Sequence, residues 1–289
     1  MNILVTGSNG QLGSEIKDII ANYKYFSFFF MDLPELDICN SNHLDAFFKD
    51  KKINIVINCA AYTAVDKAEH NSEIANKVNS EGVSNLIKAL DKVNGKLIHI
   101  STDYVFDGYN SQPYLESDPV NPIGVYGETK RAGELAVLNS NLDALVIRTS
   151  WLYSSFGNNF TKTMLRLGGE KESLNVICDQ LGTPTYAKNL AKTCLEILSG
   201  HRSSNISEKG NLYHYSNEGV ASWYDFAISI MELAELNCKV KPIHTKDYPT
   251  LAKRPQYSVL NKTKIKEDFK IEIPYWRDSL KKCINKLKL

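Results

Sequence analysis

The sequence lacks several features that would place it in a specialised class of protein. Its 289 residues carry a net charge of only +1, from 34 Lys and Arg against 33 Asp and Glu. No bulk field therefore attracts nucleic acid or an anionic membrane, and an anionic ligand has to be bound by local groups. Internal repeats and low-complexity tracts are also missing. Hydrophobic residues make up 43% of the chain, which is ordinary for a globular protein.

Cysteine and histidine are few and scattered. The six cysteines form no CxxC pair, and the six histidines form no HxH cluster. This distribution argues against a zinc site or a disulfide framework and indicates a reducing compartment. We therefore predict no metal site, and we interpret the cysteines as small hydrophobic residues. They are Cys39, Cys59, Cys178, Cys194, Cys238 and Cys283.

Long apolar runs are missing as well. The longest apolar cluster, over residues 25–33, is about half of the ~20 residues that a membrane helix needs. The chain begins directly with a short apolar run, without the basic leader and cleavage site of a signal peptide. These features predict a cytoplasmic protein that has neither a membrane nor a nucleic acid as its partner.

Short β-type runs alternate with helical patterns along the first 150 residues. Because the runs are continuous in Val, Ile and Leu, they indicate strands that are buried on both faces. Alternation of such strands with helices implies a parallel sheet. The predicted fold class is α/β, a Rossmann-type, doubly wound parallel sheet. Strands are predicted at 3–5, 26–31, 53–59, 96–101 and 144–148, and helices at 11–21, 41–49, 72–93 and 126–138.

Beyond Thr149 the pattern is less regular, and longer polar segments separate the helical stretches. We predict a dinucleotide-binding domain over 1–150, completed by about 186–213, and a smaller, mainly C-terminal lobe from 151–185 and 214–289. A cleft between two such lobes is a common place for a small ligand. Helices are predicted at 160–167, 189–199, 223–236 and 275–289, a surface loop at 205–211, and irregular chain at 242–255.

A glycine motif, GSNGQLG, follows the first predicted strand and opens the first helix. Gly7 can make the tight turn, Gly10 lets a diphosphate approach the backbone, and Gly13 lets the helix pack close to the sheet. The diphosphate would lie on free N–H groups at the positive end of the helix. The alternative is a plain glycine turn between a strand and a helix.

Asp32 follows Gly13 by 19 residues and ends the second predicted strand. A carboxylate at this place hydrogen-bonds the adenosine ribose of a dinucleotide. The alternative is a loop aspartate in the turn before Pro34. No Arg lies near Ser8 or Asp32 in the sequence to bind a 2′-phosphate, so the local residues favour NADH without excluding NADPH.

Tyr126 and Lys130 are spaced i and i+4, so they share one face of a predicted helix. A phenol normally titrates near ~10. A nearby ammonium favours the phenolate, so the pair could give a proton to a carbonyl oxygen while a hydride reaches the carbon. A hydroxyl from Thr102 or Ser101, at the end of the fourth strand, could hold that oxygen in line. A surface Tyr/Lys pair is the alternative, and it becomes less favoured beside the glycine motif.

Together these motifs resemble the extended short-chain dehydrogenase/reductases and, more narrowly, the dTDP-4-dehydrorhamnose reductase family. The resemblance covers nearly the whole chain. It implies reduction of the 4-keto group of dTDP-4-dehydro-L-rhamnose to dTDP-L-rhamnose with NADPH or NADH. The matching stretches are GSNGQLG (7–13), NCAAYTAVDKAE (58–69), STDYVFDG (101–108), YGETK (126–130), RTSWLY (148–153), GNNFTKTML (157–165), DQLGTPT (179–185), Tyr213-His214, SWYDFA (222–227) and RPQYSVL (254–260).

The resemblance also implies a role for particular residues. The catalytic set it implies is Thr102, Tyr126 and Lys130. The coenzyme residues it implies are Gly7, Gly10, Gln11, Leu12, Gly13, Asp32, Asp37, Ile38, Ala60, Ala61 and Tyr62, with Tyr126 and Lys130 at the nicotinamide ribose. The residues it implies for the dTDP-linked 4-keto sugar are Val65, Asp103, Tyr104, Trp151, Asn158 and Arg254.

Other interpretations stay open at this stage. Trp151 could be a packing aromatic, and Arg254 could lie in a solvated loop, although its planar fork suits a diphosphate. The protein could be another nucleotide-sugar reductase or an epimerase, or a non-catalytic binding subunit of the same fold. A homodimer is left open. Some family members dimerise through a metal held by acidic side chains; Glu15 fits one such position, but Lys188 occupies another.

Overall fold

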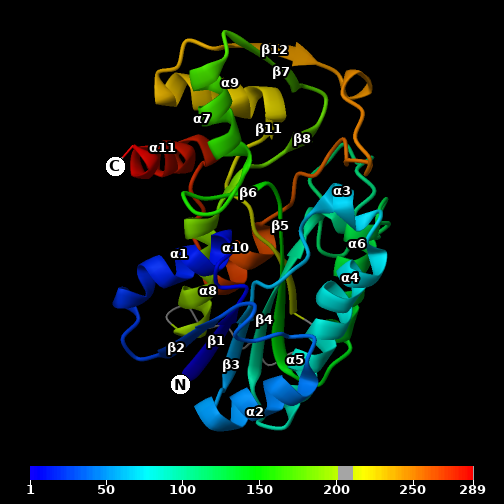
Figure 1. The fold of residues 1–289 in the computed structure, drawn as a ribbon, viewed down its shortest axis with the longest axis vertical. Coiled ribbons are helices and arrows are strands. Elements are labelled where there is room, and N and C mark those ends of the chain that lie inside the picture. The colour runs from blue at the N-terminus through cyan, green and yellow to red at the C-terminus, as the bar shows by residue number, and fades with distance from the viewer. Residues whose placement is uncertain (201–210, 289) are drawn as a thin grey trace.

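The computed structural model describes residues 1–200 and 211–288. Its lower part in Figure 1 is a six-stranded sheet, and a smaller lobe lies above it. The sheet order is β2-β1-β3-β4-β5-β10, and all five pairings are parallel. The predicted doubly wound α/β fold is thereby confirmed. The strands are β1 (Asn2–Thr6), β2 (Ser27–Met31), β3 (Ile55–Asn58), β4 (Lys96–Thr102), β5 (Asp143–Thr149) and β10 (Asn211–His214).

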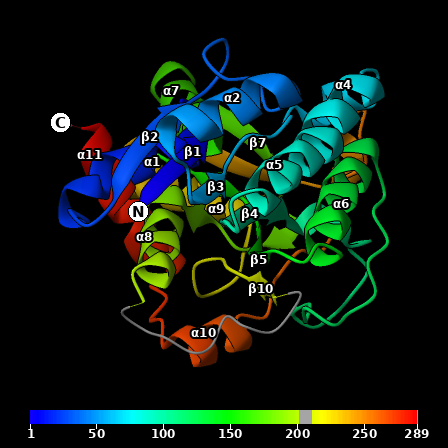
Figure 2. The same cartoon turned by 90° about the horizontal axis from the view of Figure 1, so that it is seen from below.

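Alternate residues of these strands point to opposite faces of the sheet, and helices cover both faces (Figure 2). Leu4 and Val56 join one buried cluster, whereas Val5 and Ile57 join the other. The first face packs against α2 (Ser41–Lys51), α5 (Gly82–Asp91) and α6 (Val125–Leu138). The second packs against α1 (Gln11–Ile19), α8 (Ala187–Leu198) and α10 (Thr263–Phe269).

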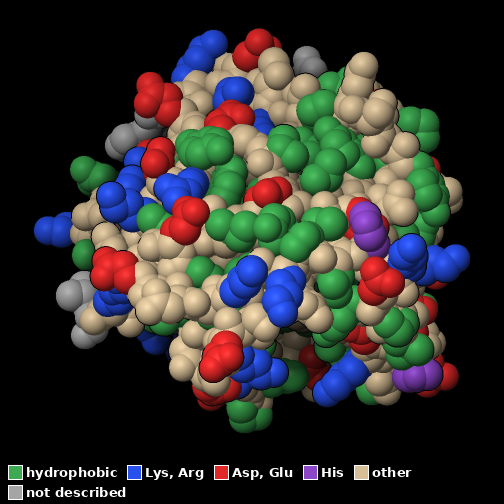
Figure 3. All heavy atoms as spheres, turned by 90° about the horizontal axis from the view of Figure 1, so that it is seen from above, with side chains coloured by type: hydrophobic (Ala, Val, Ile, Leu, Met, Phe, Trp, Pro, Cys, Tyr) green, Lys and Arg blue, Asp and Glu red, His purple; other side chains and the backbone are tan. Residues whose placement is uncertain are grey.

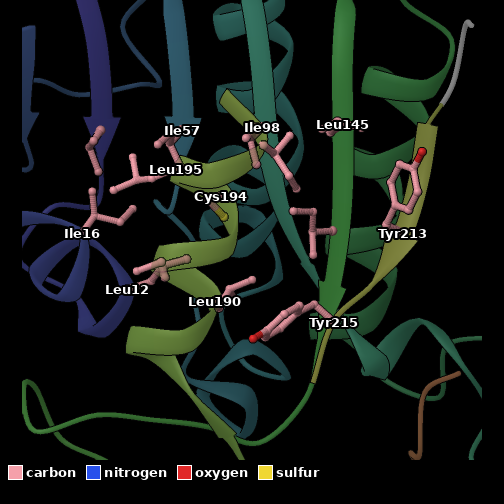
Figure 4. Close-up of a cluster of buried hydrophobic side chains, with 14 of the residues drawn as sticks. Leu12, Ile16, Ile57, Ile98, Leu145, Leu190, Cys194, Leu195, Tyr213 and Tyr215 are labelled. Atoms are coloured by element: carbon pink, nitrogen blue, oxygen red, sulfur yellow. The ribbon is translucent and has the colours of Figure 1, made fainter. Parts of the chain in front are cut away.

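Helix α8 packs against the sheet, although it follows the first segments of the lobe in the sequence. Figure 4 shows its Leu190, Cys194 and Leu195 against strand residues and against Ile16 of α1. Leu190 and Cys194 are fully buried, and burial of each large apolar side chain stabilises the fold by about 1.5–3 kcal/mol. The chain therefore returns from the lobe to complete the sheet with α8 and β10.

The lobe is built from helices and short strand pairs around its own apolar cluster, which includes Phe226, Trp276 and Leu280. Its helices are α7 (Phe160–Glu170), α9 (Trp223–Ala234) and α11 (Trp276–Leu287). Its strands are β6 (Leu152–Tyr153), β7 (Ser173–Ile177), β8 (Leu181–Gly182), β9 (Thr185–Tyr186), β11 (Ala221–Ser222) and β12 (Lys239–Ile243), with a 3₁₀ turn, η4 (Thr245–Asp247). Figure 3 looks down on this lobe and shows acidic and basic side chains interspersed over its surface.

Two predictions about loops need correction. The segment 242–255 is not irregular throughout, because β12 pairs with β7 through Ile243 and Ile177, and η4 follows. Pro242 lies within β12, and a proline inside a run argues against a strand, so the sequence pattern hid this edge pair. Of the loop predicted at 205–211, Asn211 instead begins β10, and the remaining residues lie outside the described chain.

The remaining elements are one long helical run and three short helical segments. The 72–93 helix is one continuous run made of α4 (Ser72–Asn76), a π-helical turn η2 (Lys77–Glu81) and α5. The others are η1 (Ile20–Asn22), α3 (Val65–Ala68) and η3 (Asp103–Val105). In the residues described, no helix combines the length and the apolar character needed to cross a membrane.

Candidate active site

A cavity of about 840 Å³ lies at the carboxyl edge of the sheet, beneath the lobe. It includes the point between β1 and β3 where the strand order reverses, which is where ligands bind in open α/β sheets. Its volume is within the range of ligand pockets. Most predicted site residues line it: Gly7, Gly10, Gln11, Leu12, Asp32, Asp37, Ile38, Ala60, Ala61, Tyr62, Val65, Thr102, Asp103, Tyr104, Tyr126, Lys130, Trp151 and Asn158. Gly13 and Arg254 are not among the lining residues.

The glycine loop has the geometry that a diphosphate requires. Gly7 adopts a left-handed φ of 60°, and a Cβ there would lie 2.6 Å from the backbone N of Ala60. Gly13 lies under the loop, where a Cβ would lie 2.5 Å from Cα of Ser8. Gly10 caps α1 without any side-chain hydrogen bond, so the N–H groups of the first turn remain available. The donors and the close approach fit an anionic group at this helix end.

Asp32 joins the glycine loop to the end of β2. Its Oδ2 accepts a hydrogen bond from the backbone N of Asn9 at 2.9 Å, and its Oδ1 accepts one from the backbone N of Leu33 at 2.9 Å. The carboxylate is therefore held in place before any ribose contact is made. Farther along the same wall, Asp37 accepts from the backbone N of Cys39, and Ile38 is buried.

Tyr126 and Lys130 lie on the first turns of α6 and point into the cavity. The helix begins where Oε1 of Glu69 accepts a hydrogen bond from the backbone N of Val125 at 3.0 Å. Lys130 is 2% exposed, and its Nζ donates to the carbonyl oxygen of Ile100 at 2.7 Å. Burial lowers the pKa of Lys130 to about 8. The spacing of the motif thus places both groups on the cavity wall.

The pKa of Tyr126 differs from the sequence-based expectation. Burial raises it to about 12, and the Thr102 hydroxyl opposes that rise. The expectation was that Lys130 favours the phenolate, but the pKa of the phenol rises, and burial is the largest cause. A phenol that keeps its proton at neutral pH suits a proton donor.

Thr102 ends β4 beside Tyr126, and Asp103 begins η3. Oγ1 of Thr102 donates to Oδ1 of Asp103 at 3.0 Å and accepts from the backbone N of Tyr104 at 3.2 Å. Asp103 is 3% exposed, and burial raises its pKa to about 6 against the opposing hydroxyls of Ser258 and Thr102. Of the two hydroxyls that the sequence offered, Thr102 is the one that lowers the pKa of the phenol.

Asn79 supports the site and was missed by the sequence reasoning. It lies on the π-helical turn η2 and is 1% exposed. Its side chain accepts from the backbone N of Tyr62 at 2.8 Å and donates to Oγ1 of Thr129 at 3.1 Å. These bonds fix the loop after β3 against α6, one residue before Lys130. An asparagine on the apolar face of a long helix was the signal available.

Trp151 stands on the lobe side of the cavity in a strained backbone conformation. Its φ is 47°, in the left-handed region that non-glycine residues seldom adopt. The indole stacks on Trp223 with ring centroids 3.6 Å apart, and the backbone N of Thr185 donates to its carbonyl oxygen at 3.0 Å. Such strain persists only where the surrounding structure enforces it. Trp151 is both packed and part of the cavity wall, so the two interpretations are compatible.

Arg254 lies outside the main cavity and forms an ion pair. Its Nη2 lies 2.6 Å from Oδ2 of Asp66, and the backbone N of Ala252 donates to Oδ1 of the same carboxylate at 3.0 Å. Arg254 lines a smaller neighbouring cavity of about 250 Å³. Its guanidinium also opposes the burial that raises the pKa of Tyr104, a residue of the main cavity. Arg254 thus lies near the rim, held by Asp66.

A polar seam joins α1 to the lobe. Oε1 of Gln11 accepts from Asn159 at 3.0 Å, and Oε1 of Glu15 accepts from Ser154 at 2.6 Å. Glu15 is fully buried, and its hydrogen bond to Ser154 links α1 to the lobe of the same chain. Among the residues described, no group of three or more His, Cys, Asp or Glu is arranged to hold a metal.

The similarity to known proteins covers nearly the whole chain. The profile of the family described as RmlD substrate binding domain matches residues 1–289. A dTDP-4-dehydrorhamnose reductase from Aggregatibacter actinomycetemcomitans is 40% identical over 285 residues, covering 96% of this chain and 97% of that protein. A crystal structure of such a reductase from Clostridium acetobutylicum has a TM-score of 0.93 and 41% identity over 100% of both chains. Another, from Bacillus anthracis in complex with NADP, has a TM-score of 0.93 and 35% identity over 99% of both.

Proposed function

The chain belongs to the dTDP-4-dehydrorhamnose reductase family, and we propose that it catalyses the reaction of that name. It reduces the 4-keto group of dTDP-4-dehydro-L-rhamnose to the hydroxyl of dTDP-L-rhamnose with NADPH or NADH. This places it in dTDP-rhamnose biosynthesis. The observation that carries the proposal is that Tyr126, Lys130 and Thr102 line one cavity together with the glycine loop.

The coenzyme would be held by the sheet half of the cavity. The first-turn N–H groups of α1 fit the diphosphate, and Asp32 lies where the adenosine ribose is expected. Ala60 and Tyr62 follow β3 and line the same wall. When bound, the reduced nicotinamide ring supplies the hydride. The Bacillus anthracis relative is in complex with NADP, so the proposal includes a coenzyme with a 2′-phosphate.

Tyr126 would give its proton to the oxygen of the keto group as the hydride reaches the carbon. Its raised pKa keeps the phenol protonated at neutral pH, and Lys130 beside it can then stabilise the phenolate that forms. Burial in the cavity excludes bulk water and strengthens these interactions. The keto oxygen becomes a hydroxyl, and the phenol regains a proton from solvent before the next turnover.

The sugar nucleotide would lie between this catalytic set and the lobe. Trp151 offers a stiff aromatic surface, and Val65, Asp103, Tyr104 and Asn158 line the same space. Arg254 at the rim offers a guanidinium for the diphosphate once Asp66 gives up part of the ion pair. We place the working protein in the cytoplasm, where its unpaired cysteines stay reduced.

The proposal is tested by following the oxidation of NADH and of NADPH with a panel of 4-keto sugar nucleotides. Turnover with dTDP-4-dehydro-L-rhamnose, faster than with the same sugar on another base, is the expected result. An epimerase keeps its nicotinamide bound through many turnovers, so near-stoichiometric absorbance of bound NAD in purified protein, without net oxidation, would favour that alternative. Binding of sugar nucleotide with no turnover at all would favour a non-catalytic subunit.

A further inference from the structure

The end of β4 contains a feature that the proposed reaction does not explain. The hydroxyl hydrogen of Thr102 is directed at Oδ1 of Asp103, 3.0 Å from Oγ1, and one lone pair of Oγ1 accepts from the backbone N of Tyr104. An ionised carboxylate can only accept hydrogen bonds. While Asp103 is ionised, Thr102 therefore has no hydrogen to give to the phenol of Tyr126 or to a keto oxygen.

We propose that Asp103 is a positioning residue that sets the direction of the Thr102 hydroxyl. Ionised Asp103 accepts the Thr102 hydrogen and leaves Thr102 as an acceptor towards Tyr126. When Asp103 is protonated, its carboxyl group donates a hydrogen bond to Oγ1 of Thr102. The Thr102 hydrogen then turns towards the phenol. The inference rests on the proposed function, because the proton transfer from Tyr126 is the step that it modifies.

The surroundings of Asp103 allow both protonation states. In the described part of the chain, no Lys, Arg or His comes within ion-pair distance of its carboxylate, and Oδ2 has no hydrogen-bond partner. From α6 it faces Tyr126, whereas Nζ of Lys130 on the same helix donates to the carbonyl oxygen of Ile100. From η3 it faces Tyr104.

The C-terminal segment contributes Ser258 near the carboxylate, and Arg254 of that segment is paired with Asp66. The carboxyl group is thus buried against hydroxyls and phenols, without a cation to hold it ionised. Its pKa of about 6 agrees with this environment. Desolvation by a bound substrate would raise that pKa further.

The direction of the hydroxyl matters in the transition state. As Tyr126 transfers its proton, negative charge develops on the phenol oxygen, and a hydrogen bond donated by Thr102 stabilises that charge. A hydrogen bond to a charged group corresponds to roughly tenfold or more in rate. The form with protonated Asp103 is therefore the faster one, and kcat/KM should fall by about tenfold as the pH rises through 6.

The test is the pH profile of kcat/KM, which reports the ionisation of free enzyme. We expect a step near pH 6 in the wild type and in Thr102→Ser, which keeps the hydroxyl. We expect no step in Asp103→Asn, which does not titrate, and none in Thr102→Val, in which Asp103 is intact but has no hydroxyl to turn. A step that survives in Thr102→Val, or is missing in the wild type, would overturn the proposal.

A second measurement needs neither substrate nor coenzyme. The side-chain carboxyl ¹³C signal of Asp103, assigned by its loss in Asp103→Asn, should titrate near pH 6 in free protein. Thr102→Val removes a donor to the ionised form, so it should raise this pKa, while Ser101→Ala, a neighbouring hydroxyl, should leave it unchanged. An unchanged titration in Thr102→Val sinks the proposal. Lack of turnover in the wild type, with the expected titrations present, would instead count against the proposed function alone.

Discussion

The two halves of the cavity are built in different ways. In the sheet half, several site residues stand at strand ends: Gly7 follows β1, Ala60 comes soon after β3, and Thr102 ends β4. In the lobe half, the wall comes from the separate segments 151–160 and 223–226, with 252–258 close by. Strand register alone places the first set, whereas the second set depends on packing between distant parts of the chain.

The charges of the two halves differ in the same way. Under the sheet half, Glu134 and Arg148 form a bidentate pair whose side chains are 0% and 1% exposed. At the lobe rim, Asp66 and Arg254 are 47% and 19% exposed. A buried pair is costly to break, whereas an exposed pair contributes little. The sheet half is therefore expected to be rigid, and the rim is free to exchange its partner for a ligand.

The largest effect is expected from Tyr126→Phe, which removes the proton donor of the sheet half. Turnover should fall by about 10²–10⁴-fold, the usual contribution of a general acid. Coenzyme affinity should change little, because the diphosphate and adenosine-ribose contacts are elsewhere in that half and Lys130 stays at the nicotinamide ribose. The measurement is steady-state oxidation of coenzyme, with coenzyme binding by titration.

Tyr104→Phe is the matched control. Its ring packs edge-on against Tyr126 at 5.4 Å, so the variant removes a neighbouring phenol oxygen while keeping the packing. We expect less than about tenfold loss, on the scale of one neutral hydrogen bond. Equal losses in the two variants would mean that neither phenol is the specific proton donor.

The next largest effect should be on stability. Glu134→Gln leaves Arg148 charged and buried without its carboxylate, which should cost about 3–5 kcal/mol. For a chain of this size, that is a fall in Tm of roughly 6–20 °C. Asp66→Asn breaks the exposed pair, and we expect a change of at most about 4 °C. Thermal unfolding measures both, and similar falls would remove the contrast between the halves.

The loss of stability in Glu134→Gln should depend on pH in a definite direction. Although burial alone would raise it, the hydrogen bonds from Arg148 keep the pKa of Glu134 below its ordinary value. A carboxylate with a lowered folded-state pKa stabilises the protein above its unfolded-state pKa, and that contribution is lost as the pH falls through the folded value. The gap in Tm between wild type and Glu134→Gln should therefore be full at neutral pH and shrink in acid below about pH 4.

The same contrast explains which parts of the structure could be predicted from the sequence. Continuous apolar runs gave the parallel strands, and the positions of Gly7, Tyr126 and Lys130 followed from their places at strand ends and on one helix face. Asp66 could not be found as the partner of Arg254, because 188 residues separate them and only the fold brings them together. The hydrogen-bond partner of Thr102 could not be found either. Asp103 is adjacent, but a sequence does not show where a hydroxyl points.

Arg254→Ala tests the lobe rim and should have a smaller effect. A charge-assisted bond to a diphosphate is worth about 1.5–3 kcal/mol, or roughly 10- to 150-fold in affinity. Because Arg254 must first release Asp66, we expect the low end, about a tenfold rise in KM for the sugar nucleotide. Arg254→Lys should recover only part of it, since Lys lacks the planar fork. A loss of coenzyme affinity would contradict the division between the halves.

The smallest effect is expected from Asp32→Ala, which probes how far the sheet half fixes the choice of coenzyme. The side chain accepts hydrogen bonds from the backbone N of Asn9 and of Leu33, so its removal loosens the glycine loop for both coenzymes. It also removes the proposed ribose contact and a negative charge close to a 2′-phosphate. With each hydrogen bond worth about 1 kcal/mol, NADH affinity should fall roughly five- to tenfold, and NADPH affinity should fall less because repulsion is relieved. Asp37→Ala, on the same wall but farther along it, is the control and should not shift the preference. Equal weakening of NADH and NADPH in Asp32→Ala would make Asp32 a support of the loop only, and coenzyme choice would then have to come from residues beyond the glycine motif.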